Sequence, residues 1–318
     1  MNRPALSLVV PVYNEELCLE EFFKRCSAML SESGTDAEFV FINDGSTDGS
    51  ARLLKDLSRK DPSVRVIHFS RNFGHQIAIK AGIDHAQGRA VVIIDSDLQD
   101  PPEVIPDLIA KWREGYEVVF AMREKREGES WFKRWTAELY YRLMRRLAHV
   151  DIPLDSGDFR LIDERVADCL KNVHERNPYM RGLISWTGFR QIGIPIQRRA
   201  RFAGHTKYSF KKMAQLAWNG ITHFSFLPLQ LCTVVGFLTA LFSLLFIGQS
   251  LYAKFYLNTT VPGWTSIMIA VLFLGSVQLI TLGIIGSYLG RIYDESRQRP
   301  LYLISSREGF EELADVVS

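Results

Sequence analysis

The sequence lacks the cysteine pattern of a disulfide-rich or zinc-binding protein. It has four cysteines in 318 residues, and no two of them are spaced as CxxC. Isolated cysteines are typical of reduced, buried thiols in a cytosolic setting. The sequence also lacks an excess of either charge: 38 Lys and Arg residues are balanced by 36 Asp and Glu residues, and the formal net charge is only +2. Without a strong positive field, a nucleic-acid partner is not expected.

Two nucleotide-binding signatures are missing as well. No GxGxxG follows the first apolar run, and no GxxxxGK[ST] is present. These absences count against a dinucleotide-dependent enzyme and against a P-loop nucleotide hydrolase. The N-terminal residues, MNRPALSLVV, run directly into an expected strand, so no signal peptide is expected.

The C-terminal third, in contrast, contains long apolar runs. Residues 229–248 carry no charged side chain, and a second uncharged stretch covers residues 263–290. Crossing a bilayer takes about twenty apolar residues, and a soluble helix would show a polar stripe that both stretches lack. We therefore predict two transmembrane helices within residues 227–290, joined by a short outer loop.

Basic residues flank the two predicted spans and are nearly missing between them. The loop between the spans holds a single lysine, Lys254. The basic residues around the spans are Arg198, Arg199, Arg201, Lys207, Lys211, Lys212, Arg291, Arg297 and Arg299. Lys and Arg concentrate on the cytoplasmic side of membrane proteins. We predict a multi-pass protein of the cell inner (plasma) membrane, with residues 1–207, the tail 291–318 and both termini in the cytoplasm.

About the first 120 residues alternate between short apolar runs and helical patterns. The apolar runs are LSLVV, EFVFI, VRVIHF, AVVII and EVVFA. Continuous apolar strands separated by helices are typical of a parallel sheet that is covered on both faces. We predict an α/β, Rossmann-like domain over residues 1–207, with its ligands beyond the carboxyl ends of the strands.

Polar residues follow several of these predicted strands. PVYNEE comes after the first, NDGSTDGS after the second, DSDLQD after the fourth and MREKR after the fifth. Asp95 and Asp97 are two apart on an extended segment, so they lie on the same side and repel unless a cation bridges them. Carboxylates at such a place suit Mg²⁺ or Mn²⁺ that also holds a diphosphate. Asp100 and Glu103 are equally explained by the start of a helix at the two prolines.

The motifs VVPVYNEE, FINDGSTDGS, DSDLQDPPE and SGDFRL, followed by two apolar spans, resemble those of the polyprenyl-phosphate glycosyltransferases of GT-A family 2. This group includes dolichol-phosphate mannose synthases and the bacterial glucosyltransferases of O-antigen modification, to which the chain is most similar. The resemblance covers nearly the whole chain. It implies a metal-dependent GT-A enzyme that moves glucose from UDP-glucose, with inversion, to an undecaprenyl-type polyprenyl phosphate at the cytoplasmic membrane face.

The resemblance also implies roles for individual residues. Asp95 and Asp97 match the family's DxD metal motif, and Gln99 matches a polar residue that completes the metal shell. Asp158 in SGDFRL matches the catalytic base, with Asp155 as a nearby alternative. The residues expected around the nucleotide-sugar are Pro11, Tyr13, Asn14, Glu15, Asp44, Asp95, Arg201 and Lys207.

The acceptor is expected at the membrane surface. Residues 131–150 and 208–226 combine apolar residues at helical spacing with basic ones, as interfacial amphipathic helices do. For residues 131–150, a helix packed on the domain with a solvated basic face is the alternative. A phosphate monoester has its second pKa near 6, so a lipid phosphate needs little help from a base. The residues expected to bind the lipid phosphate are Arg123, Lys133 and Arg134.

Three alternatives to this function can be compared with the sequence. The donor could be GDP-mannose or a UDP-aminoarabinose with the same chemistry. A processive polysaccharide synthase would need a Q-x-x-R-W motif and more spans, and the chain has neither. A non-catalytic membrane scaffold that binds nucleotides would not need the intact DxD motif or Asp158. The sequence does not fix the oligomeric state, and a homo-oligomer is one of the states it allows.

Overall fold

The computed structural model describes residues 3–123, 156–176, 178–197, 227–256 and 263–310. These residues fall into two compact units. The first unit contains the described part of the N-terminal domain together with residues 299–310, and the second contains residues 227–256 and 263–298. The predicted interfacial helices lie outside the described residues.

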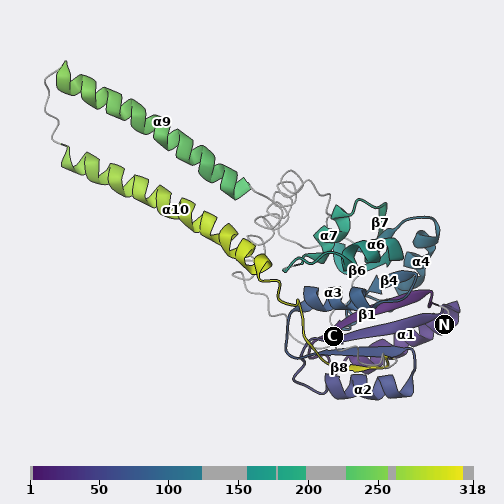
Figure 1. The fold of residues 1–318 in the computed structure, drawn as a ribbon. Helices are drawn as coiled ribbons and strands as arrows, with labels where there is room; N and C mark the ends of the chain where they lie inside the picture. The colour runs from purple at the N-terminus through teal and green to yellow at the C-terminus, as the bar shows by residue number, and fades with distance from the viewer. Residues whose placement is uncertain (1–2, 124–155, 177, 198–226, 257–262, 311–318) are drawn as a thin grey trace. The chain divides into compact units, whose positions relative to one another are not determined.

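An eight-stranded sheet with the order β7-β5-β6-β4-β1-β2-β3-β8 forms the centre of the first unit (Figure 1). Its strands are β1 Leu6–Val12, β2 Ala37–Asn43, β3 Val64–Phe69, β4 Ala90–Ile93, β5 Val118–Arg123, β6 Ser156–Asp163, β7 Gln191–Ile196 and β8 Ile304–Glu308. β6 and β8 are antiparallel to their neighbours, and the other strands run in one direction. The predicted α/β, Rossmann-like fold with a mostly parallel sheet is confirmed.

Helices cover both faces of this sheet, as the continuous apolar strands require. They are α1 Leu19–Ser33, α2 Ser50–Lys60, α3 His75–His85, α4 Ile105–Arg113 after the short 3₁₀ helix η1 Pro102–Val104, α6 Glu164–Lys171 and α7 Met180–Trp186. Alternate residues of the central strand β1 point to opposite faces. Leu8 and Val10 belong to the core cluster with α1, α2 and α4, whereas Val9 belongs to the cluster with α3, α6 and α7. Val9 also pairs with Val40 on one side and with Ile93 on the other.

The strand β8 closes one edge of the sheet and comes from the C-terminal stretch that we treated as a tail. It pairs antiparallel with β3, with Val66 opposite Glu308. The Tyr302 ring stacks on Phe69 with a centroid distance of 5.0 Å. Residues after the second apolar helix are therefore part of the N-terminal domain's sheet.

The second unit consists of two long helices, α9 Leu227–Phe255 and α10 Trp264–Ser296. Both predicted spans are thus helical, and large apolar side chains such as Phe237 and Leu279 are exposed on them. Among the described residues, one segment, Phe273–Ser296, is long and apolar enough to cross a membrane by length and composition. A second crossing is not confirmed, and the multi-pass topology stays a prediction.

Candidate active site

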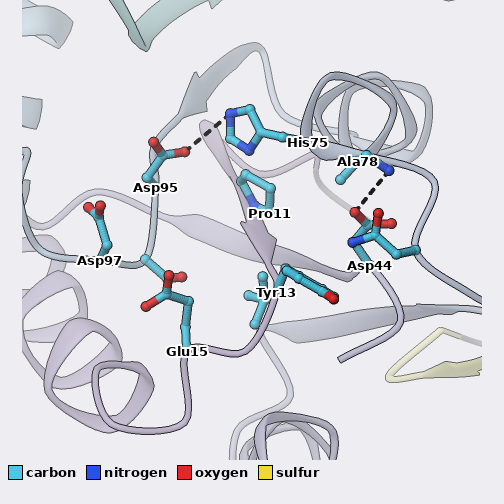
Figure 2. A pocket seen from close by; sticks show the side chains of 12 residues that line it. Pro11, Tyr13, Glu15, Asp44, His75, Ala78, Asp95 and Asp97 are labelled. Atoms are coloured by element: carbon cyan, nitrogen blue, oxygen red, sulfur yellow. Dashed lines mark hydrogen bonds and ion pairs between the residues drawn. The ribbon is translucent and has the colours of Figure 1, made fainter. Parts of the chain in front are cut away.

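A cavity of about 220 Å³ lies at the carboxyl ends of β1, β2, β3 and β4 (Figure 2). The residues that line it are Pro11, Val12, Tyr13, Glu15, Asp44, Asn72, Gly74, His75, Ala78, Asp95, Ser96 and Asp97. In Figure 2, the side chains of Pro11 and Tyr13 lie between Asp95 and Asp44. The cavity is where the switch-point rule for open α/β sheets places a ligand. It brings together five of the predicted nucleotide-sugar residues: Pro11, Tyr13, Glu15, Asp44 and Asp95.

Asn14 is not among the lining residues and instead ties two loops together. Its φ of 57° is in the left-handed region, which asparagine tolerates better than most residues. Its backbone N–H donates to Ser46 Oγ at 3.1 Å, and its Oδ1 accepts from the Thr47 backbone at 2.8 Å. The segment after β1 is thereby fixed against the NDGST turn after β2.

Asp44 anchors a third loop, the one between β3 and α3. Its side chain is buried, and it accepts backbone hydrogen bonds from Phe73 at 2.6 Å and Gly74 at 3.0 Å. Burial raises the pKa of this carboxyl, although the two backbone hydrogen bonds oppose the rise. Asp44 therefore shapes the cavity wall, and its predicted contact with the nucleotide-sugar stays a prediction.

Asp95 and Asp97 follow β4 and both face the cavity. The Oδ1 of Asp95 is buried and has no hydrogen-bond donor among the described residues. Burial raises the pKa of Asp95 to about 6; the charge of His75 opposes this, and the carboxylates of Asp158 and Asp97 add to it. Asp97 Oδ1 accepts the backbone N–H of Gln99 at 3.1 Å. Gln99 itself is not among the residues that line the cavity.

His75, which we did not predict, lies between two carboxylates. It is the first residue of α3, and its Nε2 is 3.2 Å from Asp158 Oδ2 and 3.6 Å from Asp95 Oδ1 (Figure 2 shows the second contact). Burial disfavours the charged ring, but the hydrogen bond to Asp158 and the charge of Asp95 outweigh it and raise the pKa of His75 to about 9. A positive imidazolium thus stands where two carboxylates would otherwise repel each other.

Asp158, the predicted base, lies on β6 and is 10% exposed. Arg181 on α7 donates to it twice, from Nε to Oδ1 at 2.7 Å and from Nη2 to Oδ2 at 3.1 Å. Burial by itself would raise the pKa of Asp158, but the hydrogen bonds from His75 and Arg181 hold it well below its usual range. The carboxyl is a permanent anion at neutral pH.

The site residues that sequence reasoning missed come from helices rather than from the strand ends that we assigned. His75 follows the third strand, and the segment SRNFGHQ there could have been found by applying the strand-end rule to that strand too. Arg181 follows no strand end, and only the packing of α7 against α3 and α6 brings it to Asp158. Nothing in the local sequence marks that contact.

The acidic pair fits a divalent cation whose other ligands are oxygens of a diphosphate. In the described part of the chain, no three His, Cys, Asp or Glu side chains form a ready-made metal cage. Mg²⁺ does not need one, because it usually takes one or two carboxylates and completes its shell with water and phosphate oxygens. The Oδ1 of Asp95 is buried, accepts no hydrogen bond among the described residues and lies 3.6 Å from His75 Nε2. Together with Asp97, which lines the same cavity, it fits the one or two carboxylates that such an ion takes.

The remaining predicted residues cannot be placed at the site. Arg123 ends β5, and its side chain is not described. The other predicted residues outside the described ranges are Lys133, Arg134, Asp155, Arg201 and Lys207. Their roles stay predictions.

Comparison with known proteins places the chain in a family. Residues 7–171 match the family described as "Glycosyl transferase family 2". The chain belongs to glycosyl transferase family 2, so the predicted family is confirmed.

Several curated relatives are similar over nearly the full chain. The "Uncharacterized glycosyltransferase YkcC" of Bacillus subtilis (strain 168) is 49% identical over 96% of this chain and 94% of its own length. The "Bactoprenol glucosyl transferase" of Shigella phage SfV is 41% identical over 95% of this chain and 99% of its own length. The "Prophage bactoprenol glucosyl transferase homolog" of Escherichia coli (strain K12) is 40% identical over 94% of this chain and 98% of its own.

Proposed function

We propose that the protein transfers glucose from UDP-glucose to an undecaprenyl-type polyprenyl phosphate at the cytoplasmic face of the cell inner membrane. The observation that carries this proposal is the cavity lined by the acidic pair, Asp95 and Asp97, and by His75, whose ring also contacts Asp158. That cavity belongs to a family 2 domain followed by two long apolar helices. The full-length similarity to proteins named bactoprenol glucosyl transferases supports the choice of sugar and lipid.

The donor occupies the cavity, with its nucleotide against Pro11, Tyr13 and Glu15. Asp95 and Asp97 hold Mg²⁺ or Mn²⁺ at the diphosphate, and Gln99 is the further ligand expected from the family. When bound, the ion stabilises the negative charge that develops on the leaving diphosphate. Arg201 and Lys207 are expected to add positive charge to the same phosphates.

The acceptor is a phosphate monoester, and its oxygen is the nucleophile. It forms a bond to the anomeric carbon on the face opposite the departing diphosphate, so one displacement inverts the configuration. The second pKa of such a phosphate lies near 6, so at neutral pH most of it is already a dianion. Arg123, Lys133 and Arg134 are expected to guide the lipid phosphate, and the apolar helices keep the domain at the bilayer where that lipid resides.

The proposal is tested with a panel of labelled nucleotide-sugars. Membranes containing the full chain are incubated with UDP-glucose, GDP-mannose or a UDP-aminoarabinose, with and without added undecaprenyl phosphate. We expect label to reach organic-soluble lipid from UDP-glucose alone, and only when the lipid phosphate is present. The product should be β-linked, which NMR of the anomeric proton determines.

Two outcomes would contradict the proposal at different levels. Label that moves from GDP-mannose or the UDP-aminoarabinose but not from UDP-glucose would overturn the choice of sugar and keep the reaction class. No transfer from any donor to any lipid phosphate, with nucleotide binding retained, would favour a non-catalytic scaffold.

A further inference from the structure

Asp158 is surrounded by hydrogen-bond donors from two helices. Arg181 of α7 donates to both of its oxygens, at 2.7 and 3.1 Å. The Nε2 of His75, the first residue of α3, is 3.2 Å from Oδ2, and the Nε2 of Gln76 donates to the same oxygen at 3.4 Å. The carboxylate is only 10% exposed, while the side chain of Arg181 is 30% exposed.

This arrangement fits poorly with proton abstraction by Asp158. A carboxylate oxygen offers about two lone pairs, and three donors already converge on Oδ2. Hydrogen bonds to the charged form hold the pKa of this carboxyl well below its usual range. A general base works best when its pKa is close to the working pH, and a phosphate acceptor that arrives as a dianion has no proton to lose.

The same arrangement fits well with fixing an arginine. The planar guanidinium suits phosphate oxygens, and a two-point contact with a carboxylate sets its plane. Gln76 reinforces this, because its Oε1 accepts the backbone N–H of Met180, the residue before Arg181, at 3.0 Å. The start of α7 is thereby tied to the start of α3, next to the residue that faces Asp95.

We propose that Arg181 binds the acceptor phosphate, and that Asp158 is the positioning residue that holds Arg181 rather than the base. His75 separates the carboxylates of Asp158 and Asp95, so the phosphate-binding arginine and the diphosphate site lie on either side of one imidazole. This inference rests on the proposed function, because it assigns the acceptor of that reaction to particular side chains.

The decisive variant is Asp158→Asn in the full chain, assayed with labelled UDP-glucose and undecaprenyl phosphate. The amide oxygen still accepts a hydrogen bond from Arg181 but cannot serve as a base at neutral pH. A weakened charge-assisted contact corresponds to about tenfold or more in binding, so we expect the acceptor KM to rise by about that factor. The kcat at saturating acceptor should stay within about tenfold of the wild type. Loss of a true base costs about 10²–10⁴-fold in rate, so a kcat reduced by two orders of magnitude or more would overturn the inference.

A double-mutant cycle adds a second readout. If Asp158 acts through Arg181, the two residues share one contact and their effects are not additive. Arg181→Ala should raise the acceptor KM at least as much as Asp158→Asn, and adding Asp158→Asn to Arg181→Ala should change it by less than about threefold. If the two increases in acceptor KM multiply in the double variant, the inference is overturned. Arg59→Ala is the matched control, because it removes the same charge from an exposed place in the last turn of α2 and should behave as wild type.

Two controls separate misfolding and failure of the proposed function from failure of this inference. UDP-glucose affinity, measured by calorimetry, should be unchanged in every variant. If Asp158→Asn does not fold, Arg181→Lys carries the test: it keeps the charge but loses the two-point contact, and an unchanged acceptor KM would overturn the inference. If the wild type is active and Asp158→Asn lowers kcat by two orders of magnitude or more, this inference alone is overturned. If the wild type transfers glucose to no lipid phosphate, the proposed function is overturned and this inference with it.

Discussion

A Cβ atom on Gly45 would lie 2.5 Å from the backbone nitrogen of Asn72. Gly45 follows β2 in the NDGST turn, and Asn72 lies in the loop between β3 and α3 and lines the cavity. The φ of Gly45 is +66°, in the left-handed region that favours glycine. Two loops that form the cavity therefore touch backbone to backbone, and only glycine allows that approach.

Gly45→Ala should damage the cavity as well as the fold. Left-handed strain costs about 1–2 kcal/mol, and displacing the facing backbone adds about 1–3 kcal/mol. We expect the free energy of unfolding to fall by the sum, and the affinity for UDP-glucose to fall because the displaced Asn72 loop lines the cavity.

Gly34→Ala is the matched control for this change. Gly34 has a similar φ of +60°, but no atom lies within 4 Å of the added methyl group. It should cost only the strain, about 1–2 kcal/mol, and leave the affinity for UDP-glucose unchanged. Chemical unfolding and calorimetry measure the two quantities. Equal effects of the two variants on donor affinity would show that the contact with the Asn72 loop does not matter.

Asp44→Asn tests the carboxylate that anchors the same loop. Asp44 accepts backbone hydrogen bonds from Phe73 and Gly74 with separate oxygens, and an amide offers only one oxygen. One N–H of these half-buried residues would lose its acceptor, which costs about 0.5–1.5 kcal/mol. We expect chemical unfolding to show that loss, together with weaker binding of UDP-glucose. Lost donor affinity at unchanged stability would instead mean that Asp44 acts on the nucleotide alone.

The sequence was sufficient for the strands whose signal is local. Each of the five apolar runs became a strand, because a strand buried on both faces is apolar along its whole length. The position of β6 was not predictable in this way. It lies between β4 and β5, with Val91 opposite Ile162 and Val119 opposite Leu161. Such pairing depends on tertiary contacts, and no local pattern records it.

The residues of the site also differ in whether a local sequence signal marks them. Asp95 and Asp97 were predicted because they follow a strand, and the sheet brings strand ends to one edge; Asp44, which also follows a strand, was implied by the family resemblance. His75 and Arg181 act through geometry that only the packed helices create. The strand β8 was missed for a third reason: its sequence, ISSRE, is short and mostly polar and is held by its edge position on β3.

Asp97→Asn tests the metal site. If Asp95 and Asp97 hold the ion at the donor diphosphate, losing one carboxylate should reduce transfer by about 10²-fold or more, the scale on which charge stabilisation acts in catalysis. A chelator in excess should have the same effect on the wild type, and added Mg²⁺ or Mn²⁺ should reverse it. Asp107→Asn is the control, because Asp107 is an exposed acid on α4. Full activity in excess chelator would rule out the metal.

The last prediction concerns the stretch after α10, where Tyr302 connects β8 to the helical layer. Its hydroxyl donates to Asp84 Oδ2 at 3.3 Å, and the other oxygen of Asp84 pairs with the buried Lys80. Burial raises the pKa of Tyr302, with the charge of Asp84 adding to the rise. Tyr302 is therefore a neutral donor at physiological pH. Its ring and its hydroxyl both fix the segment that leads into β8.

Graded variants at Tyr302 should separate these two contacts. Tyr302→Phe keeps the ring on Phe69 and loses the hydrogen bond, which contributes about 0.5–1.5 kcal/mol. Tyr302→Ala loses the aromatic pair as well and should cost about 2–4 kcal/mol. Hydrogen exchange of the β3 amides is the local readout, because β8 pairs with that strand. Leu303→Ala is the control, since Leu303 is 55% exposed and should change stability by less than about 0.5 kcal/mol. If β3 exchanges at the wild-type rate in Tyr302→Ala, Tyr302 does not hold β8 in the sheet.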